Sequence, residues 1–116
     1  MIRIFIDSDA CPVKDEVYRV AGRYSLHVYV VSNRMIAVPP SPLIERVVVE
    51  AGADVADDWI AERVQDRDIV ITSDIPLAAR CIEKGAFVLE HKGRRMDSDA
   101  IGMALATSNL MTDLRA

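Results

Sequence analysis

Residues 54–83, DVADDWIAERVQDRDIVITSDIPLAARCIE, decide the fold expected for this chain. Residues 54–64 predict a helix, and a polar turn follows it. The run at residues 69–72 predicts a strand, and the apolar run at residues 2–6 predicts another that is buried on both faces, as in a parallel sheet. A second helix over residues 74–84 is expected to stop at Gly85, because glycine readily adopts the backbone conformation that ends a helix.

The rest of the chain continues this alternation of strands and helices. Further strands are expected at residues 2–6, 27–31, 44–49 and 86–89, a helix at 12–24, and helix or helical turns at 97–114. Prolines make residues 35–43 a loop. Strands alternating with helices predict a three-layer α/β/α sandwich around a mainly parallel sheet of about five strands.

Acidic residues follow two of the predicted strands and open one of the predicted helices. Asp7 and Asp9 follow the first strand, Asp74 follows the strand at 69–72, and Asp57 and Asp58 lie in a first helical turn. Sites in open α/β folds lie at the carboxyl ends of the strands, so we expect these acids to meet there. Crowded carboxylates either take up protons or bind a cation, and oxygen-only ligands suit Mg²⁺ or Mn²⁺.

Each of these acids also has a purely structural interpretation. The helix dipole favours Asp57 and Asp58 in a first turn, and Asp74 is a natural N-cap. Asp7 is also placed to cap a following helix. The functional interpretation therefore depends on the combination and not on any single acid.

Polar and basic residues are predicted at the same edge of the sheet. Lys14, Asn33 and Arg34 come after the first two strands, and a basic loop at 91–95 contains Arg94 and Arg95. Side chains of these kinds bind nucleic-acid backbones. We expect these five residues to contact substrate, with solvated loop residues as the alternative.

Composition limits the class of protein. At 116 residues and 51% hydrophobic residues, the chain predicts one domain with a core of its own. No apolar run approaches the ~20 residues that cross a membrane, and no signal peptide is evident. Cys11 and Cys81, the two cysteines, are expected to be free thiols in a reducing cytoplasm. A net charge of −4 argues against non-specific binding of nucleic acid, but not against a nucleic-acid enzyme.

The blocks ADDWIAERV and DIVITSDIPLAAR resemble those of flap-type 5′ nucleases and of PIN and NYN ribonuclease domains. The wider set of DSDACPVK, SNR, VPPSP, ADDWI and ITSDIPLAAR is similar to the YaiI/YqxD family of uncharacterised bacterial proteins, which belongs with PIN-like folds. The second resemblance covers nearly the whole chain. It implies a PIN-like fold over residues 1–116 and a C-terminal continuation beyond them.

The resemblance also implies roles for individual acids. Asp7, Asp57, Asp58 and Asp74 match the metal ligands of the wider nuclease fold, and Asp9 is an addition typical of the YaiI/YqxD family. Flap-type nucleases often place another aspartate where this chain has Pro76. That difference favours one tightly held cation, with a second bound together with substrate.

Three functional hypotheses follow. The first is a Mg²⁺- or Mn²⁺-dependent nuclease that acts on RNA rather than DNA, in the cytoplasm, as a monomer or a homo-oligomer. The second is a phosphatase with an aspartyl-phosphate intermediate at Asp7, because DSDAC resembles the start of haloacid-dehalogenase-type enzymes. The third is a non-catalytic module that binds nucleic acid or metal on a nuclease-like fold, so enzymatic activity itself stays open.

Overall fold

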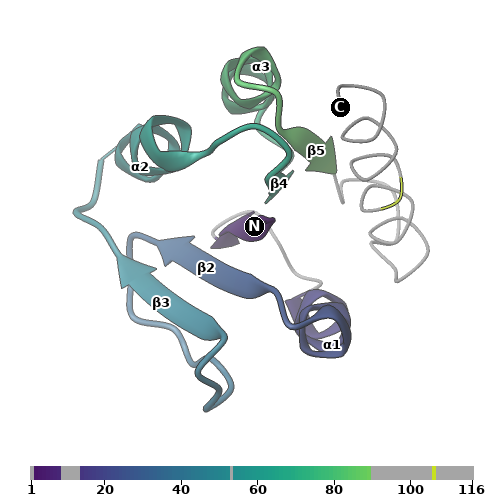
Figure 1. The fold of residues 1–116 in the computed structure, drawn as a ribbon. Coiled ribbons are helices and arrows are strands. Elements are labelled where there is room, and N and C mark those ends of the chain that lie inside the picture. Colours follow the sequence, from purple (N-terminus) through teal and green to yellow (C-terminus); the bar gives the residue numbers. More distant parts are fainter. Residues whose placement is uncertain (1, 9–13, 53, 90–105, 107–116) are drawn as a thin grey trace.

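The computed structural model describes residues 2–8, 14–52, 54–89 and 106, and it shows a twisted sheet with helices on both faces (Figure 1). In chain order the elements are β1 (Arg3–Asp7), α1 (Lys14–Tyr24), β2 (His27–Ser32), β3 (Ile44–Val48), α2 (Val55–Arg63), β4 (Ile69–Ile71), α3 (Ile75–Glu83) and β5 (Phe87–Leu89). The expected elements within the described ranges are all present. The helix expected at 97–114 lies outside those ranges, apart from Ala106.

The five strands lie in the order β3-β2-β1-β4-β5, and every neighbouring pair is parallel. The chain winds outward from β1 through β2 to β3, and it then returns to place β4 against the free side of β1. The winding direction therefore reverses between β1 and β4. Binding sites in open α/β sheets occur at the carboxyl ends of strands beside such a reversal.

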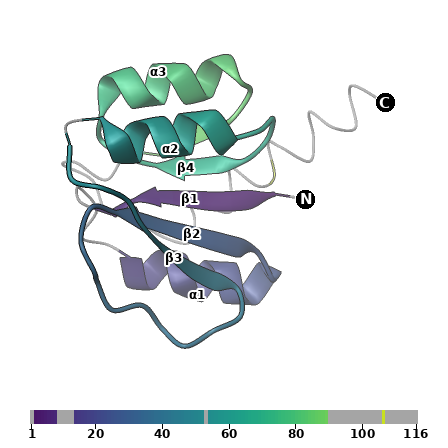
Figure 2. The same ribbon diagram turned by 90° about the vertical axis from the view of Figure 1, so that its left-hand side faces the viewer.

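The helices of the described residues lie on both faces of the sheet. α1 lies on one face, while α2 and α3 lie side by side on the other (Figure 2). Successive residues of a strand point to opposite faces. Ile4 and Ile6 of β1 accordingly pack with α1 in one core, whereas Phe5 packs with α2 and α3 in the other. The continuous apolar runs noted in the sequence are thus explained by burial on both faces.

The connection from β2 to β3 contains no helix. Residues 33–43 form a loop, as the prolines predict, and β3 pairs directly with β2.

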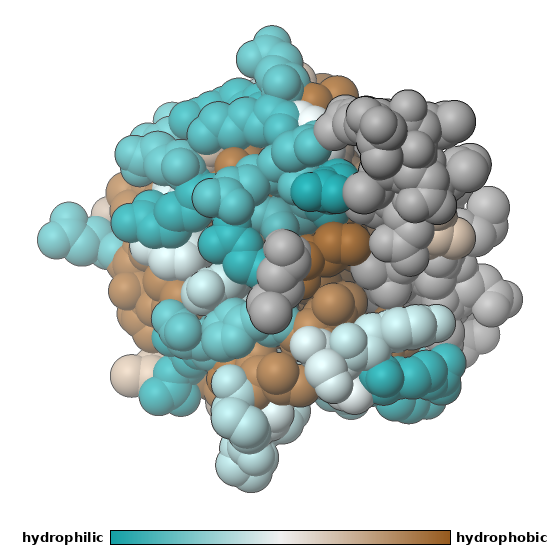
Figure 3. Space-filling model, in the orientation of Figure 1, coloured by the Kyte–Doolittle hydropathy of each residue, from teal (hydrophilic) through white to brown (hydrophobic). Residues whose placement is uncertain are grey.

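The exposed side of α2 is largely hydrophilic (Figure 3). No helix within the described residues is long and apolar enough to cross a membrane.

The expected end of the last described helix is confirmed. α3 ends at Glu83, Lys84 is its C-cap, and Gly85 follows with a φ of 88°. The backbone N–H of Gly85 donates to the carbonyl of Ile82 at 2.9 Å. Glycine tolerates this left-handed conformation without the steric cost of a side chain.

Candidate functional site

Three acids from three elements come together at the carboxyl edge of the sheet. Asp7 is the last residue of β1, Asp57 lies in the first turn of α2, and Asp74 is the N-cap of α3. Both helices begin at the edge toward which the strands point (Figure 2). Parallel strands deliver their carboxyl ends to one edge, so residues far apart in the sequence meet there.

Asp7 is buried and hydrogen-bonded at this edge. Asp7 is only 6% exposed, and its Oδ2 accepts a hydrogen bond of 2.8 Å from the hydroxyl of Thr72. Thr72 directly follows β4, the neighbour of β1 in the sheet, and is itself buried. A buried carboxylate needs such donors, because burial without a partner is costly.

Asp74 is fixed by two contacts with the backbone. Its Oδ1 accepts a hydrogen bond of 2.9 Å from the N–H of Leu77, which is the capping interaction predicted from the sequence. Its own N–H donates to Thr72 Oγ1 at 3.0 Å. The structural interpretation of Asp74 is therefore confirmed, and it coexists with the position of Asp74 beside the other acids.

Asp57 completes the group, which we call the carboxylate cluster: Asp7, Asp57 and Asp74. Burial raises the pKa of Asp57 to about 6, and the charges of Asp74 and Asp7, a hydrogen bond with Asp74 and the charge of Asp54 add to that rise. A hydrogen bond between two carboxyl groups requires a proton on one of them. At mildly acid pH the carboxylate cluster therefore keeps a proton and does not ionise fully.

Asp58 does not join the carboxylate cluster. Its Oδ1 pairs instead with Nη1 of Arg80 on α3 at 2.8 Å. Helical spacing gives the reason: Asp57 shares a stripe with the buried residues Ile60, Ala61 and Val64, whereas Asp58 shares one with the exposed Glu62. The proposed role of Asp58 as a metal ligand stays a prediction.

The predicted substrate-binding residues are only partly described. Asn33 and Arg34 follow β2 at the same edge and are exposed, and the N–H of Arg34 donates to Ser32 Oγ at 3.1 Å. Lys14 is the first residue of α1, and its side chain is not described. The metal ligand Asp9 and the substrate residues Arg94 and Arg95 were also predicted, and all three lie outside the described residues.

The donors available for a metal are oxygen atoms. Within the described ranges, no group of three His, Cys, Asp or Glu side chains already has an arrangement that holds a metal ion. The free thiol of Cys81 is fully buried, and burial raises its pKa to about 11, so it is no thiolate ligand. The carboxylate cluster suits a hard divalent cation in its chemistry, although its side chains would have to shift to bind one.

Two polar residues at the site were not predicted from the sequence. Thr72 was visible there as the residue two positions before Asp74, a spacing at which a hydroxyl can accept from a following backbone N–H. Arg80 had no local signal, because its pairing with Asp58 depends on how α2 and α3 pack. Thr72 forms hydrogen bonds with Asp7 and Asp74 of the carboxylate cluster, and the charge of Arg80 interacts with that of Asp57.

Fold and site together define an α/β protein with a five-stranded parallel sheet and an acidic carboxyl edge. The chain belongs to the YaiI/YqxD family, since the family model described as "Uncharacterized BCR, YaiI/YqxD family" matches residues 5–116. The resemblance seen in the sequence is thereby confirmed at the level of the family.

Curated relatives agree with this assignment. A UPF0178 protein of Gluconacetobacter diazotrophicus is 71% identical over 116 residues, which are 100% of this chain and 75% of that protein. UPF0178 proteins of Rhodopseudomonas palustris and Bradyrhizobium diazoefficiens are 59% and 58% identical over 114 residues, 98% of this chain and 70% and 68% of theirs. No solved structure matches the chain, so the resemblance to PIN-like folds stays a prediction.

Proposed function

We propose that the protein is a metal-dependent hydrolase of phosphodiester bonds, a nuclease that acts on RNA and uses Mg²⁺ or Mn²⁺ at the carboxylate cluster. The observation that carries this proposal is the crowding of Asp7, Asp57 and Asp74, which adds to the effect of burial in raising the pKa of Asp57 to about 6. An arrangement that costs stability is typical of a functional site. The preference for RNA rests on the resemblance to PIN and NYN ribonuclease domains.

The three acids would divide the work of holding a cation. Thr72 fixes Asp7 by donating to Oδ2 and fixes Asp74 by accepting from its N–H, so these two carboxylates are preorganised. Asp57 supplies the third charge, and the proton shared with Asp74 would leave when a cation takes its place. A divalent cation bound there would stabilise charge on a phosphate and make an attacking water more acidic.

The proposal is tested by the effect of Mn²⁺ on thermal stability. We expect Mn²⁺ to raise the Tm of the wild-type protein, because a ligand that binds the folded state stabilises it. Asp57→Asn should abolish this shift, whereas Glu62→Gln, an exposed acid on the same helix, should retain it. Cleavage of a mixed RNA pool with Mn²⁺, stopped by a chelator, is the second readout.

A wild-type protein with no Mn²⁺ effect on Tm and no cleavage of the RNA pool would contradict the proposal. A second candidate function, a non-catalytic binding module, is favoured by one observation: no ready metal-binding group exists within the described ranges. A protein that binds Mn²⁺ or RNA but leaves the pool intact under all conditions would establish that alternative.

A further inference from the structure

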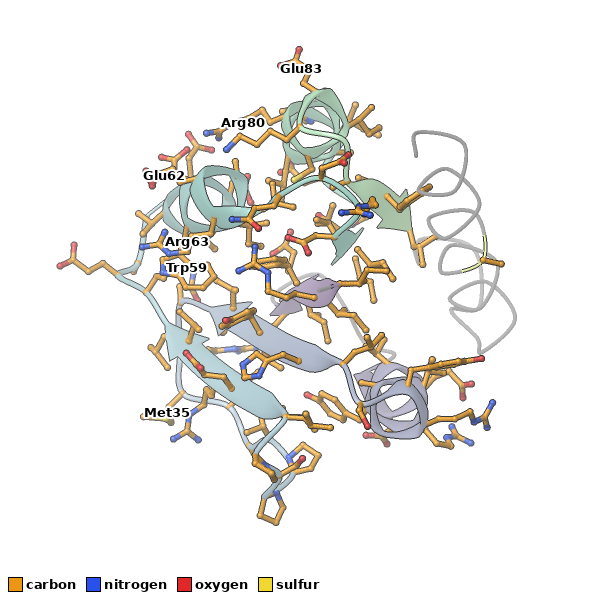
Figure 4. The ribbon with its side chains drawn as sticks, viewed as in Figure 1. Met35, Trp59, Glu62, Arg63, Arg80 and Glu83 are labelled. Carbon is orange, nitrogen blue, oxygen red and sulfur yellow. The ribbon has the colours of Figure 1, made fainter. Side chains whose placement is uncertain are left out.

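Arg80 of α3 forms an ion pair with Asp58 of α2 beside the carboxylate cluster. The Nη1–Oδ1 distance is 2.8 Å, and the two side chains are 47% and 55% exposed. Figure 4 shows Arg80 extending from α3 toward α2. Exposed ion pairs typically contribute ~0–1 kcal/mol to stability, so the fold does not depend on this pair.

Arg80 lies in the last turn of α3, and the pair holds its guanidinium group against the first turn of α2, which begins at the carboxyl edge of the sheet. Side chains of a helix lean toward its N-terminus, and α3 begins at that edge with Asp74. Asp58 lies in the first turn of α2, directly after Asp57. The hydrogen bond from Arg80 to Asp58 raises the pKa of Arg80, and the charges of Asp58 and Asp57 add to the rise.

A neighbouring cation already joins the two helices. Lys84, one helical turn after Arg80, donates through Nζ to the carbonyl oxygen of Ala61 on α2. A structural link between α2 and α3 therefore exists at that point without Arg80. Arg80 is the cation of the two whose partner is an exposed side chain, and such a partner is readily exchanged.

We propose that Arg80 is a phosphate-binding residue of the site, and that it exchanges Asp58 for a phosphate group of the substrate. This inference rests on the proposed function, because it takes the substrate to be a nucleic-acid strand. The planar guanidinium group matches phosphate oxygens with two parallel hydrogen bonds. In the absence of substrate, Asp58 compensates the charge of Arg80 and holds its side chain beside the first turn of α2.

Binding of a fluorescein-labelled single-stranded oligouridine, followed by fluorescence anisotropy with Ca²⁺ over a series of KCl concentrations, tests the proposal. Arg80→Ala should bind roughly tenfold or more weakly, the loss of a hydrogen bond between charged groups. Its slope of log K against log salt should fall by about 0.7, the value for one phosphate contact on a single strand. A merely structural residue would leave that slope unchanged.

Matched variants separate this contact from general charge. Arg23→Ala removes an exposed arginine from the last turn of α1, on the other face of the sheet, and should leave affinity and slope unchanged. Arg80→Lys should keep the slope and recover only part of the affinity, because an ammonium group lacks the planar fork. Without divalent ions, Asp58→Asn should bind more tightly than wild type, and adding Arg80→Ala should remove that gain.

The outcomes distinguish two kinds of failure. A wild-type protein that gains Tm with Mn²⁺ and binds oligouridine, while Arg80→Ala keeps the wild-type affinity and salt slope, overturns the role of Arg80 alone. A wild-type protein with neither response overturns the proposed function and this inference with it. If Arg80→Ala does not fold by circular dichroism, the Arg80→Lys and Asp58→Asn results decide in the same way.

Discussion

The hydroxyl of Thr72 donates a hydrogen bond of 2.8 Å to Asp7 Oδ2, although the two residues are 65 positions apart in the chain. The same oxygen accepts from the N–H of Asp74 at 3.0 Å. One buried hydroxyl group thus ties the end of β1 to the start of α3. It orients two members of the carboxylate cluster at once.

Replacing Thr72 by valine should therefore weaken both the fold and the site. Thr72→Val keeps the shape but leaves a buried Asp7 oxygen without this donor, an expected loss of about 1–3 kcal/mol in the free energy of unfolding. Urea denaturation measures that loss, and a Mn²⁺ titration of Tm should show weaker binding. Thr72→Ser retains the hydroxyl and should stay near wild type; equal stability of the valine variant would contradict the role given to Thr72.

Asp57→Asn should stabilise the protein in the absence of metal ions near neutral pH. The asparagine removes a carboxylate whose ionisation is opposed by burial and by the neighbouring charges of Asp74 and Asp7. Stability and function then oppose each other at this position, because the variant would also lose the Mn²⁺ response. Thermal denaturation in a chelator-containing buffer gives the comparison, and an asparagine variant that melts below wild type would argue against charge crowding.

The pH dependence of that stabilisation has a definite sign. The pKa of Asp57 rises from 3.8 to about 6 on folding, so between these values the unfolded chain has released its proton while the folded protein still holds it. Rising pH therefore destabilises the folded wild type through this window, and the penalty is constant above about pH 6. The Tm advantage of Asp57→Asn should be absent well below pH 4, grow through the window and then level off. An advantage independent of pH would rule out ionisation of Asp57 as its cause.

Strands and helices were predictable because burial on two faces leaves a local signature. The run at residues 69–71 is apolar throughout, and β4 (Ile69–Ile71), which it forms, is fully buried. Proline content likewise predicted the loop before β3. The strand order was not predictable in this way, because nothing local to β4 specifies that it pairs with β1 and not with β3.

The site was predictable as a meeting of acids but not in its details. Because Asp7 and Asp74 each follow a predicted strand, the sequence predicted that both lie at one edge of the sheet, and the structure confirms this. The rotation of α2 about its axis decides that Asp57 faces the cluster and Asp58 faces Arg80. The buried side of α2, marked by Ile60, shows which way the helix is turned. The sequence analysis gave Asp57 and Asp58 the same role because they are adjacent.

Asp68 should be the acid whose loss destabilises the fold most directly. It is 1% exposed; its Oδ1 accepts from Arg3 N at 3.0 Å and its Oδ2 from Arg3 Nη2 and Gln65 N, both at 2.8 Å. Asp68→Ala removes the acceptor of all three bonds, although Arg3 Nη2 still donates to the carbonyl of Arg63 at 2.9 Å, and should cost about 3 kcal/mol, as for other broken buried pairs. Urea denaturation should show no comparable loss for Glu83→Ala, an exposed acid on α3; equal effects would contradict this account.

Gly85→Ala should destabilise the end of α3 for two separable reasons. A side chain at a φ of 88° is strained by about 1–2 kcal/mol, and a Cβ built there lies 2.1 Å from Asp66 Oδ1. Adding Asp66→Ala should relieve the second cost and leave the first, so the double variant should recover only part of the stability measured by urea denaturation. Gly22→Ala is the matched control, because its Cβ meets nothing within 4 Å and alanine is favoured inside a helix such as α1 by about 1 kcal/mol. If both glycine variants changed stability in the same direction, the left-handed conformation of Gly85 would not be what ends the helix.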